Sequence, residues 1–186
     1  MNKPLLIYGS QEFGKIVCNL AIECGYEVAG FIDDYNSGEN ILGSYDYVKD
    51  KFPPTLFDMA IAIGYKHLES RWAIYQQVKS DGYFLPSLVH GSAYVSCQST
   101  VHAGGMIMAG AIVDAFVKVN DLVVLWPGVV VNHDSSIGSN TFLSPNATVC
   151  GFVKIGHSCF VGAGATVVDH RNVADFAFIK AGSVYK

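Results

Sequence analysis

A histidine followed directly by an acidic residue is the strongest candidate for chemistry in this sequence. His133 and Asp134 stand in the segment VNHDSS, residues 131–136. An imidazole titrates near neutral pH and a neighbouring carboxylate favours its protonated form, so the pair suits a general base. His157 has no acidic neighbour in the chain. For either histidine, a solvated side chain on a turn is the alternative interpretation.

The loop GSQEFG, residues 9–14, is a second candidate because we expect it between a strand and a helix. Free backbone amides at such a junction bind phosphate, so the loop is a candidate phosphate site. The loop keeps the outer glycines of G-x-G-x-x-G but has Gln11 at the middle one. A plain strand-to-helix turn is the alternative.

Two aspartates end the next expected strand. Asp33 and Asp34 could accept hydrogen bonds from a ribose or a base, or could cap the turn that follows. Gly64, which closes the third expected strand, is a further substrate-binding candidate. A dinucleotide domain needs about twice these strands, so a single nucleotide is the better expectation.

A sequence repeat with a period of six residues determines where His133 and Asp134 lie. Every sixth residue from Val89 to Ile179 is aliphatic, and the residue four places later is in most cases small, with Arg171 breaking the set. This period is typical of a short strand and a turn, and three such hexads form one coil of a parallel β-solenoid. The run 89–184 predicts about five coils, whose strands stack about 4.8 Å apart.

The period gives Gly151 a role beside His133. Gly151 follows His133 by 18 residues, which is one coil, so we expect it to lie directly over the histidine. Its backbone N–H could then donate to a carbonyl oxygen that becomes an oxyanion.

The first half of the chain has a different pattern. We expect strands over 5–8, 27–34 and 56–63, helices over 15–24 and 68–79, and mostly loop over 35–54, with a short helix near 45–51. Alternating strands and helices predict a small Rossmann-like parallel sheet. We place the domain boundary near Pro86, with an α/β unit over 1–86 and the solenoid over 87–186.

Composition excludes several other classes. Hydrophobic residues make up 51% and charged residues 15% of the 186, which excludes a disordered chain. The net charge of −4 gives no basic excess for a nucleic acid. Without a signal peptide or a long apolar span, we expect a cytoplasmic protein without membrane insertion. The spacing of the five cysteines predicts neither disulfides nor a zinc site, and we expect no metal.

Together, the loop 9–14, the ending of the second strand at Asp34, the hexads and the segment 131–138 resemble the bacterial sugar acyltransferases of the PglD/NeuD type. The resemblance spans nearly the whole chain and is most specific over 132–156. It implies a left-handed β-helix and a homotrimer. It also implies transfer of an acetyl group from acetyl-CoA to an amino sugar carried on a nucleotide, for a surface polysaccharide or a glycan.

The resemblance assigns roles to the candidates. His133 would accept a proton from the sugar amine as the amine attacks the thioester, Asp134 would support His133, and Gly151 would donate to the thioester carbonyl. The N-terminal domain would hold the nucleotide, with its phosphates and base near Gly9, Ser10, Gly14, Asp33 and Asp34. The pantetheine arm would pass Gly162, Ala163 and Gly164.

Departures from the family pattern leave the substrate open. Gln11, Glu12 and Phe13 stand where many members have Gly-Gly-His, and Phe142 stands where some have a second active-site histidine. An acceptor hydroxyl or a longer acyl-CoA would use the same fold. A trimeric nucleotide-binding scaffold without catalysis is the alternative from another class.

Overall fold

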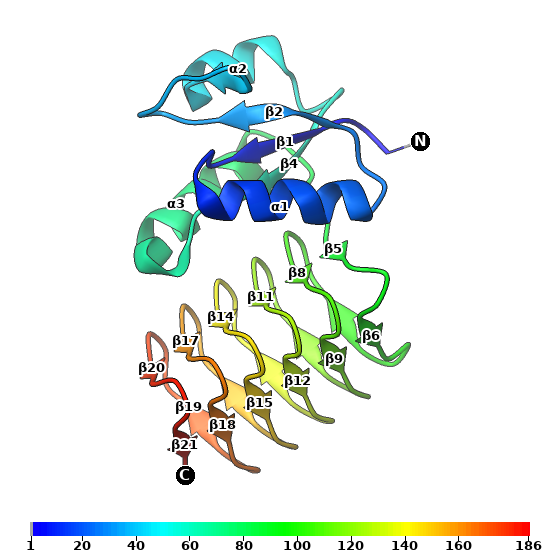
Figure 1. Cartoon of the computed structure of the whole chain (residues 1–186), viewed down its shortest axis with the longest axis vertical. Coiled ribbons are helices and arrows are strands. Elements are labelled where there is room, and N and C mark those ends of the chain that lie inside the picture. The colour runs from blue at the N-terminus through cyan, green and yellow to red at the C-terminus, as the bar shows by residue number, and fades with distance from the viewer. Residues whose placement is uncertain (1) are drawn as a thin grey trace. The chain divides into compact units, whose positions relative to one another are not determined.

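The computed structural model describes residues 2–186, and its internal contacts divide into two units (Figure 1). One unit extends to Pro86 and the other from Ser87 to Lys186. The first is a four-stranded parallel sheet with helices, and the second is a parallel β-solenoid. The expected fold class is therefore confirmed.

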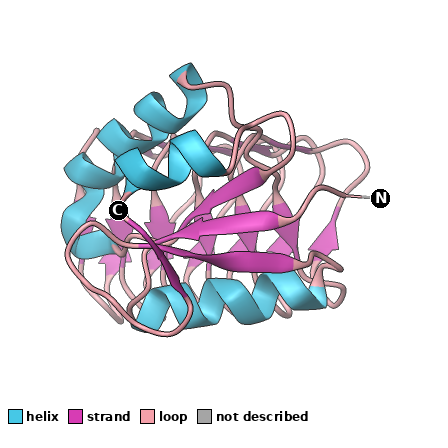
Figure 2. Ribbon diagram, turned by 90° about the horizontal axis from the view of Figure 1, so that it is seen from above, coloured by secondary structure: helices cyan, strands magenta, loops and turns pink. Residues whose placement is uncertain are grey.

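The first unit contains two strands that are buried along their whole length. Its elements are β1 (Leu5–Tyr8), α1 (Glu12–Glu23), β2 (Val28–Ile32), β3 (Ile41–Gly43), α2 (Tyr45–Lys51), β4 (Asp58–Ile61), a 3-10 turn η1 (Tyr65–His67) and α3 (Leu68–Ser80). The sheet order is β3-β2-β1-β4. Figure 2 shows α1 on one face of this sheet and α2 and α3 on the other. Because helices cover both faces, every residue of β1 and β4 is buried.

Two local expectations for this unit are wrong. The segment expected to be mostly loop contains β3, a three-residue strand that pairs with β2 through Phe31 and Ile41. So short a strand has no hydrophobic period, and only backbone pairing in the sheet defines it. Helix α1 begins at Glu12 rather than Lys15, so Gly14 lies in the helix and not in the loop.

The second unit consists of seventeen two-residue strands joined by short turns. They are β5 (Leu88–Val89), β6 (Tyr94–Val95), β7 (Thr100–Val101), β8 (Met106–Ile107), β9 (Ile112–Val113), β10 (Lys118–Val119), β11 (Val124–Leu125), β12 (Val130–Val131), β13 (Ser136–Ile137), β14 (Phe142–Leu143), β15 (Thr148–Val149), β16 (Lys154–Ile155), β17 (Phe160–Val161), β18 (Thr166–Val167), β19 (Asn172–Val173), β20 (Phe178–Ile179) and β21 (Val184–Tyr185). Each strand pairs in parallel with the third strand before and after it, which builds three sheets.

The period of six fills the solenoid interior, as expected. The second residue of every strand from Ile107 to Ile179 is buried, and the small residues four places later, such as Ala147 and Ala165, are buried against them. Burying each aliphatic side chain contributes about 1.5–3 kcal/mol, so the repeat itself supplies the core. Val95 and Val101, in the first coil, are only partly buried.

The turns between strands require left-handed backbone. One residue per turn has positive φ in most hexads, as with Gly128, Asn146 and Gly164 on one edge of the solenoid. We call the turns 132–135, 150–153 and 168–171 the histidine corner. They lead from the sheet with β12, β15 and β18 to the sheet with β13, β16 and β19, and they stack one coil apart.

Candidate functional site

The histidine corner brings His133 and Asp134 together on one turn. Both lie at its two central positions, and Nδ1 of His133 is 3.0 Å from Oδ2 of Asp134. The two side chains are 48% and 40% exposed, so the imidazole is reachable by a ligand while its Nδ1 is engaged. Asp134 adopts φ 58°, a left-handed conformation that Asp tolerates better than most residues. The free nitrogen of the imidazole is Nε2, which is the atom a general base would use.

Gly151 lies against the imidazole one coil further along. A Cβ at this position would stand 2.9 Å from Cε1 and 3.0 Å from Nε2 of His133, so only glycine leaves room for the ring. The N–H of Gly151 donates to no acceptor in residues 2–186. A base nitrogen and an unused backbone donor therefore lie side by side, which is the pairing that acyl transfer needs.

His157 occupies the equivalent position of another turn but has different neighbours. Its Nε2 is 3.0 Å from Oγ of Ser158. Asp175, one coil further along, takes the position that Gly151 has beside His133, and its carboxylate accepts a hydrogen bond from the backbone N–H of His157 at 2.7 Å. The ring of His157 therefore contacts a serine hydroxyl, and an aspartate rather than a glycine lies one coil further along, so context separates the two histidines.

The structure does not bring the remaining solenoid candidates to His133 within one chain. Gly162, Ala163 and Gly164 lie on the turn between β17 and β18, at a different edge of the solenoid. Packing alone explains why residue 162 is glycine, because a Cβ there would stand 2.4 Å from the backbone N of Ala181. Phe142 is buried on β14.

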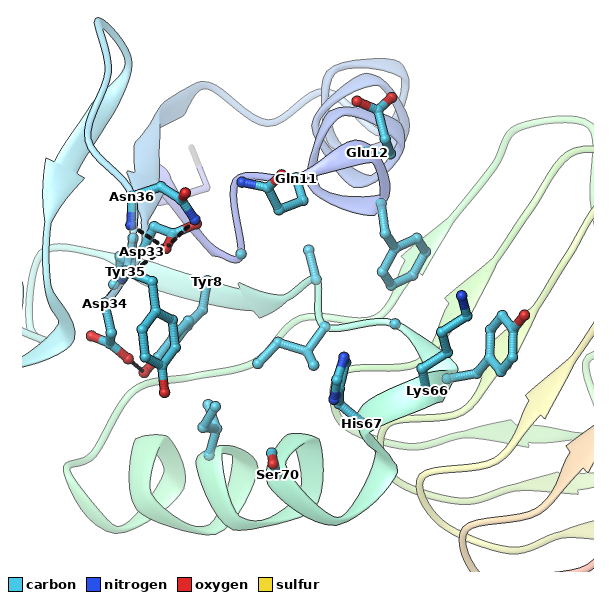
Figure 3. A pocket seen from close by; sticks show the side chains of 18 residues that line it. Tyr8, Gln11, Glu12, Asp33, Asp34, Tyr35, Asn36, Lys66, His67 and Ser70 are labelled. Carbon is cyan, nitrogen blue, oxygen red and sulfur yellow. Dashed lines mark hydrogen bonds between the residues drawn. The ribbon is translucent and has the colours of Figure 1, made fainter.

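A pocket of about 840 Å³ opens in the first unit, at the ends of its strands (Figure 3). Residues that follow β1, β2 and β4 line it, as the parallel sheet requires, because ligands of such sheets bind beyond the carboxyl ends of the strands. Gly9 and Gly64 are among the lining residues, and Ser10 and Gly14 are not. In Figure 3, Gln11 and Glu12 lie across the pocket from His67 and Ser70.

Asp33 ties two walls of this pocket together. One carboxylate oxygen accepts from Ser10 Oγ, and the other accepts from the backbone N–H groups of Tyr35 and Asn36 and from Asn36 Nδ2. Burial alone would raise the pKa of Asp33, but these hydrogen bonds outweigh it and lower the pKa to about 2. Three of these hydrogen bonds fall on Oδ1 and one on Oδ2, so Asp33 holds the turn after β2 and the Ser10 loop together and thereby shapes the pocket.

Asp34 keeps acceptor capacity. Its Oδ2 accepts from the hydroxyl of Tyr8, and its Oδ1 accepts from the backbone N–H of Tyr45 at 2.8 Å. The Tyr8 and Tyr45 rings stack with centroids 5.4 Å apart. Burial and the hydrogen bond to Asp34 raise the pKa of Tyr8. Since a carboxylate has about four acceptor sites, two remain at Asp34 for a ligand.

Close backbone contacts require glycine at Gly9, in the loop after β1, and at Gly14, in the first turn of α1. Gly9 has φ +115°, and a Cβ there would stand 2.5 Å from the carbonyl oxygen of Ala62. A Cβ on Gly14 would stand 2.1 Å from the carbonyl oxygen of Gly9, so Gly14 lets α1 pack on the end of β1. Gly64 has open space around its Cα.

Sequence reasoning missed several lining residues of the pocket. Lys66 and His67 come from the turn η1 after β4, and Tyr35 and Asn36 follow β2. The signal was available, because polar residues just after a parallel strand face the ligand edge of the sheet. Lys66 adds a positive charge to this edge.

No group of three or more His, Cys, Asp and Glu side chains in residues 2–186 is arranged to hold a metal ion. In the same range, no helix has both the length and the apolar character needed to cross a membrane.

Comparison with known families follows the division into two units. Residues 4–78 match the PglD N-terminal domain, and residues 134–169 match the bacterial transferase hexapeptide repeat. The chain combines a PglD N-terminal domain with hexapeptide repeats. The second match includes Asp134 and Gly151, so the histidine corner lies largely within hexapeptide repeats.

Similarity to solved structures extends over the whole chain. The acetyltransferase domain of PglB from Neisseria gonorrhoeae FA1090 is 28% identical with a TM-score of 0.93, over 100% of this chain and 92% of that one. The same domain in complex with acetyl coenzyme A matches at 26% identity and TM-score 0.88, over 99% and 96%.

A third structure shares the fold. It is a histidine-to-asparagine variant of perosamine N-acetyltransferase from Caulobacter crescentus, in complex with CoA and GDP-perosamine. It is 24% identical with a TM-score of 0.78, over 95% of this chain and 93% of that one.

Proposed function

We propose that this PglD-domain hexapeptide-repeat protein is an N-acetyltransferase that moves an acetyl group from acetyl-CoA to the amine of a nucleotide-linked sugar. The observation that carries the proposal is the placement of His133 between Asp134 and Gly151. The acetyl coenzyme A complex of the PglB domain and the CoA and GDP-perosamine complex of the Caulobacter enzyme support the two substrates.

The reaction follows from these side chains. The sugar amine attacks the thioester carbonyl carbon, a C–N bond forms, and the carbonyl oxygen becomes an oxyanion that the N–H of Gly151 stabilises. Nε2 of His133 takes the proton that the amine nitrogen loses. The C–S bond then breaks, the imidazolium returns this proton to the departing sulfur, and CoA thiol leaves. Asp134 at Nδ1 orients the imidazole and stabilises its charged form.

The pocket of the first unit is the proposed nucleotide site. Asp34 would accept hydrogen bonds from the base, and the backbone of the loop 9–11 with the charge of Lys66 would hold the phosphates. Asp33 and Ser10 would keep the two walls in place. Gly162, Ala163 and Gly164 lie at another edge of the solenoid, so they would reach the donor bound at His133 only from a neighbouring chain.

We propose a homotrimer, because these three residues would need a neighbouring chain to reach the donor. The sheet with β6, β9 and β21 presents apolar side chains outward, with Tyr94, Ile112 and Val184 40–58% exposed. Light scattering after size exclusion should give three times 20.1 kDa, and Ile112→Glu should lower that mass. A monomer at micromolar concentration would overturn this part of the proposal.

The test is thiol release from acetyl-CoA across UDP-, dTDP- and GDP-linked amino sugars. Wild type should release CoA with at least one acceptor, and His133→Ala should lower kcat about 100-fold or more with an unchanged Tm, since a general base typically contributes that much. His157→Ala, from the equivalent turn position, is the matched control and should keep wild-type activity. Nucleotide binding without CoA binding or turnover would favour the scaffold alternative. Release with a sugar that offers only hydroxyl groups would favour an O-acyltransferase. Release only with a longer acyl-CoA would favour a longer-chain acyltransferase.

A further inference from the structure

Phe152 is a bulky residue in a strained position. It follows Gly151 in the histidine corner with φ 57°, and its side chain remains about half exposed. Glycine and asparagine are favoured in this left-handed conformation, whereas an aromatic residue there is an outlier. Neither burial nor backbone preference explains the choice of phenylalanine.

The contacts of Phe152 point to His133. Its ring meets the imidazole edge to face, with centroids 5.2 Å apart and an interplanar angle of 88°. Its other neighbour is His170, one coil further along, whose ring stacks on it at 4.8 Å and 1°. The imidazole of His133 is thus bounded by Asp134 at Nδ1, by Gly151 near Nε2 and by the Phe152 ring.

We propose that Phe152 is a positioning residue for His133, a role that rests on the proposed function. Asp134 fixes one nitrogen of the imidazole but leaves the ring free to tilt about that hydrogen bond. The Phe152 ring closes one side of this motion, and the His170 stack keeps Phe152 itself in place. Nε2 is then held where the amine proton must be taken, and small misplacements of such a group are costly in rate.

A second pair in the solenoid has the same geometry without the same site. Phe176 also follows a histidine by nineteen residues, has φ 61°, and meets His157 edge to face at 5.6 Å and 89°. Its histidine faces Asp175 instead of a glycine. If edge-to-face packing served only the fold, both phenylalanines would respond alike to substitution.

The experiment compares Phe152→Asn, Phe152→Tyr and Phe176→Asn. Asparagine suits left-handed backbone, so neither asparagine variant should lose Tm. Phe152→Asn should lower kcat about tenfold with KM for both substrates within about twofold, as expected for a mispositioned group. Phe152→Tyr keeps the ring and should restore most of kcat, and Phe176→Asn should match wild type. Equal kcat in Phe152→Asn and wild type, or equal losses in both asparagine variants, would overturn the proposal.

A readout independent of turnover separates this inference from the proposed function. With ¹³C-labelled histidine, the Cε1–H resonance of His133 should move in Phe152→Asn, because the ring current of Phe152 is lost and the imidazole reorients. It should stay in place in Phe176→Asn. Wild type without thiol release would reject the proposed function alone, whereas an unmoved His133 resonance in Phe152→Asn would reject the positioning role.

Discussion

His133 and Gly151 stack one coil apart in the histidine corner, so closely that a Cβ on Gly151 would stand 2.9 Å from Cε1 of the imidazole. Gly151 is not among the residues with positive φ, so its backbone does not require glycine. Space for His133 is the remaining reason for glycine at this position. Its role can therefore be tested by adding a single methyl group.

Gly151→Ala should lower kcat about 100-fold, because the methyl group displaces the imidazole by a fraction of an ångström to an ångström. The Tm should fall little, since the half-exposed histidine can move away. Steady-state kinetics with thermal unfolding checks this result. Gly91→Ala is the control, because a Cβ at Gly91 meets nothing within 4 Å. A fully active Gly151→Ala enzyme would contradict the claim that His133 needs glycine at position 151.

Asp134→Asn should lower kcat about tenfold to 100-fold without lowering Tm. An amide in place of the carboxylate no longer stabilises the imidazolium, and its NH₂ can donate to Nδ1 and select the wrong tautomer. Asparagine accepts the left-handed conformation of this position. In a His133→Ala background the same substitution should have no further effect, because the two residues act as one unit. Additive losses in this double-mutant cycle would show that Asp134 acts independently of His133.

Lys66→Gln should raise KM for the nucleotide sugar about tenfold and leave KM for acetyl-CoA unchanged, because Lys66 lines the pocket of the first unit. Lys49→Gln removes a lysine that pairs with Asp46 outside the pocket, and it should change neither constant. Calorimetric titration with the nucleoside diphosphate alone measures the loss of binding affinity without turnover. Equal affinities for Lys66→Gln and wild type would remove Lys66 from the site.

Asp33→Asn should destabilise the first unit in a pH-dependent way. The hydrogen bonds to the carboxylate lower the pKa of Asp33 to about 2 when folded, against about 3.9 when unfolded. The carboxylate therefore stabilises the fold fully above about pH 4, and this contribution is lost as the pH falls toward 2. Near pH 7 the variant should unfold roughly 5 °C below wild type. In thermal unfolding, this difference in Tm should narrow steadily as the pH falls from about 4 to about 2. A gap independent of pH would mean that the charge of Asp33 contributes nothing.

The solenoid and the pairing of His133 with Gly151 could be predicted from the sequence. In a repeat with 18 residues per coil, distance along the chain converts directly into distance in space, so a spacing of 18 means direct stacking. This stacking does not depend on contacts between segments that are far apart in the sequence. The same arithmetic relates His133 to Phe152, but it cannot show that the phenylalanine side chain turns toward the imidazole.

The pocket of the first unit could not be predicted from the sequence, because it depends on contacts between distant segments. Its pocket forms where loops after β1, β2 and β4 converge, and the order of strands in the sheet sets that meeting. Asp33 and Asp34 are adjacent in sequence and looked equivalent, yet Asp33 accepts mainly from the turn that directly follows it, whereas Asp34 accepts from Tyr8 and Tyr45. Tyr8 and Tyr45 are distant from Asp34 in the sequence and reach it only in the folded unit, so no local pattern records these contacts.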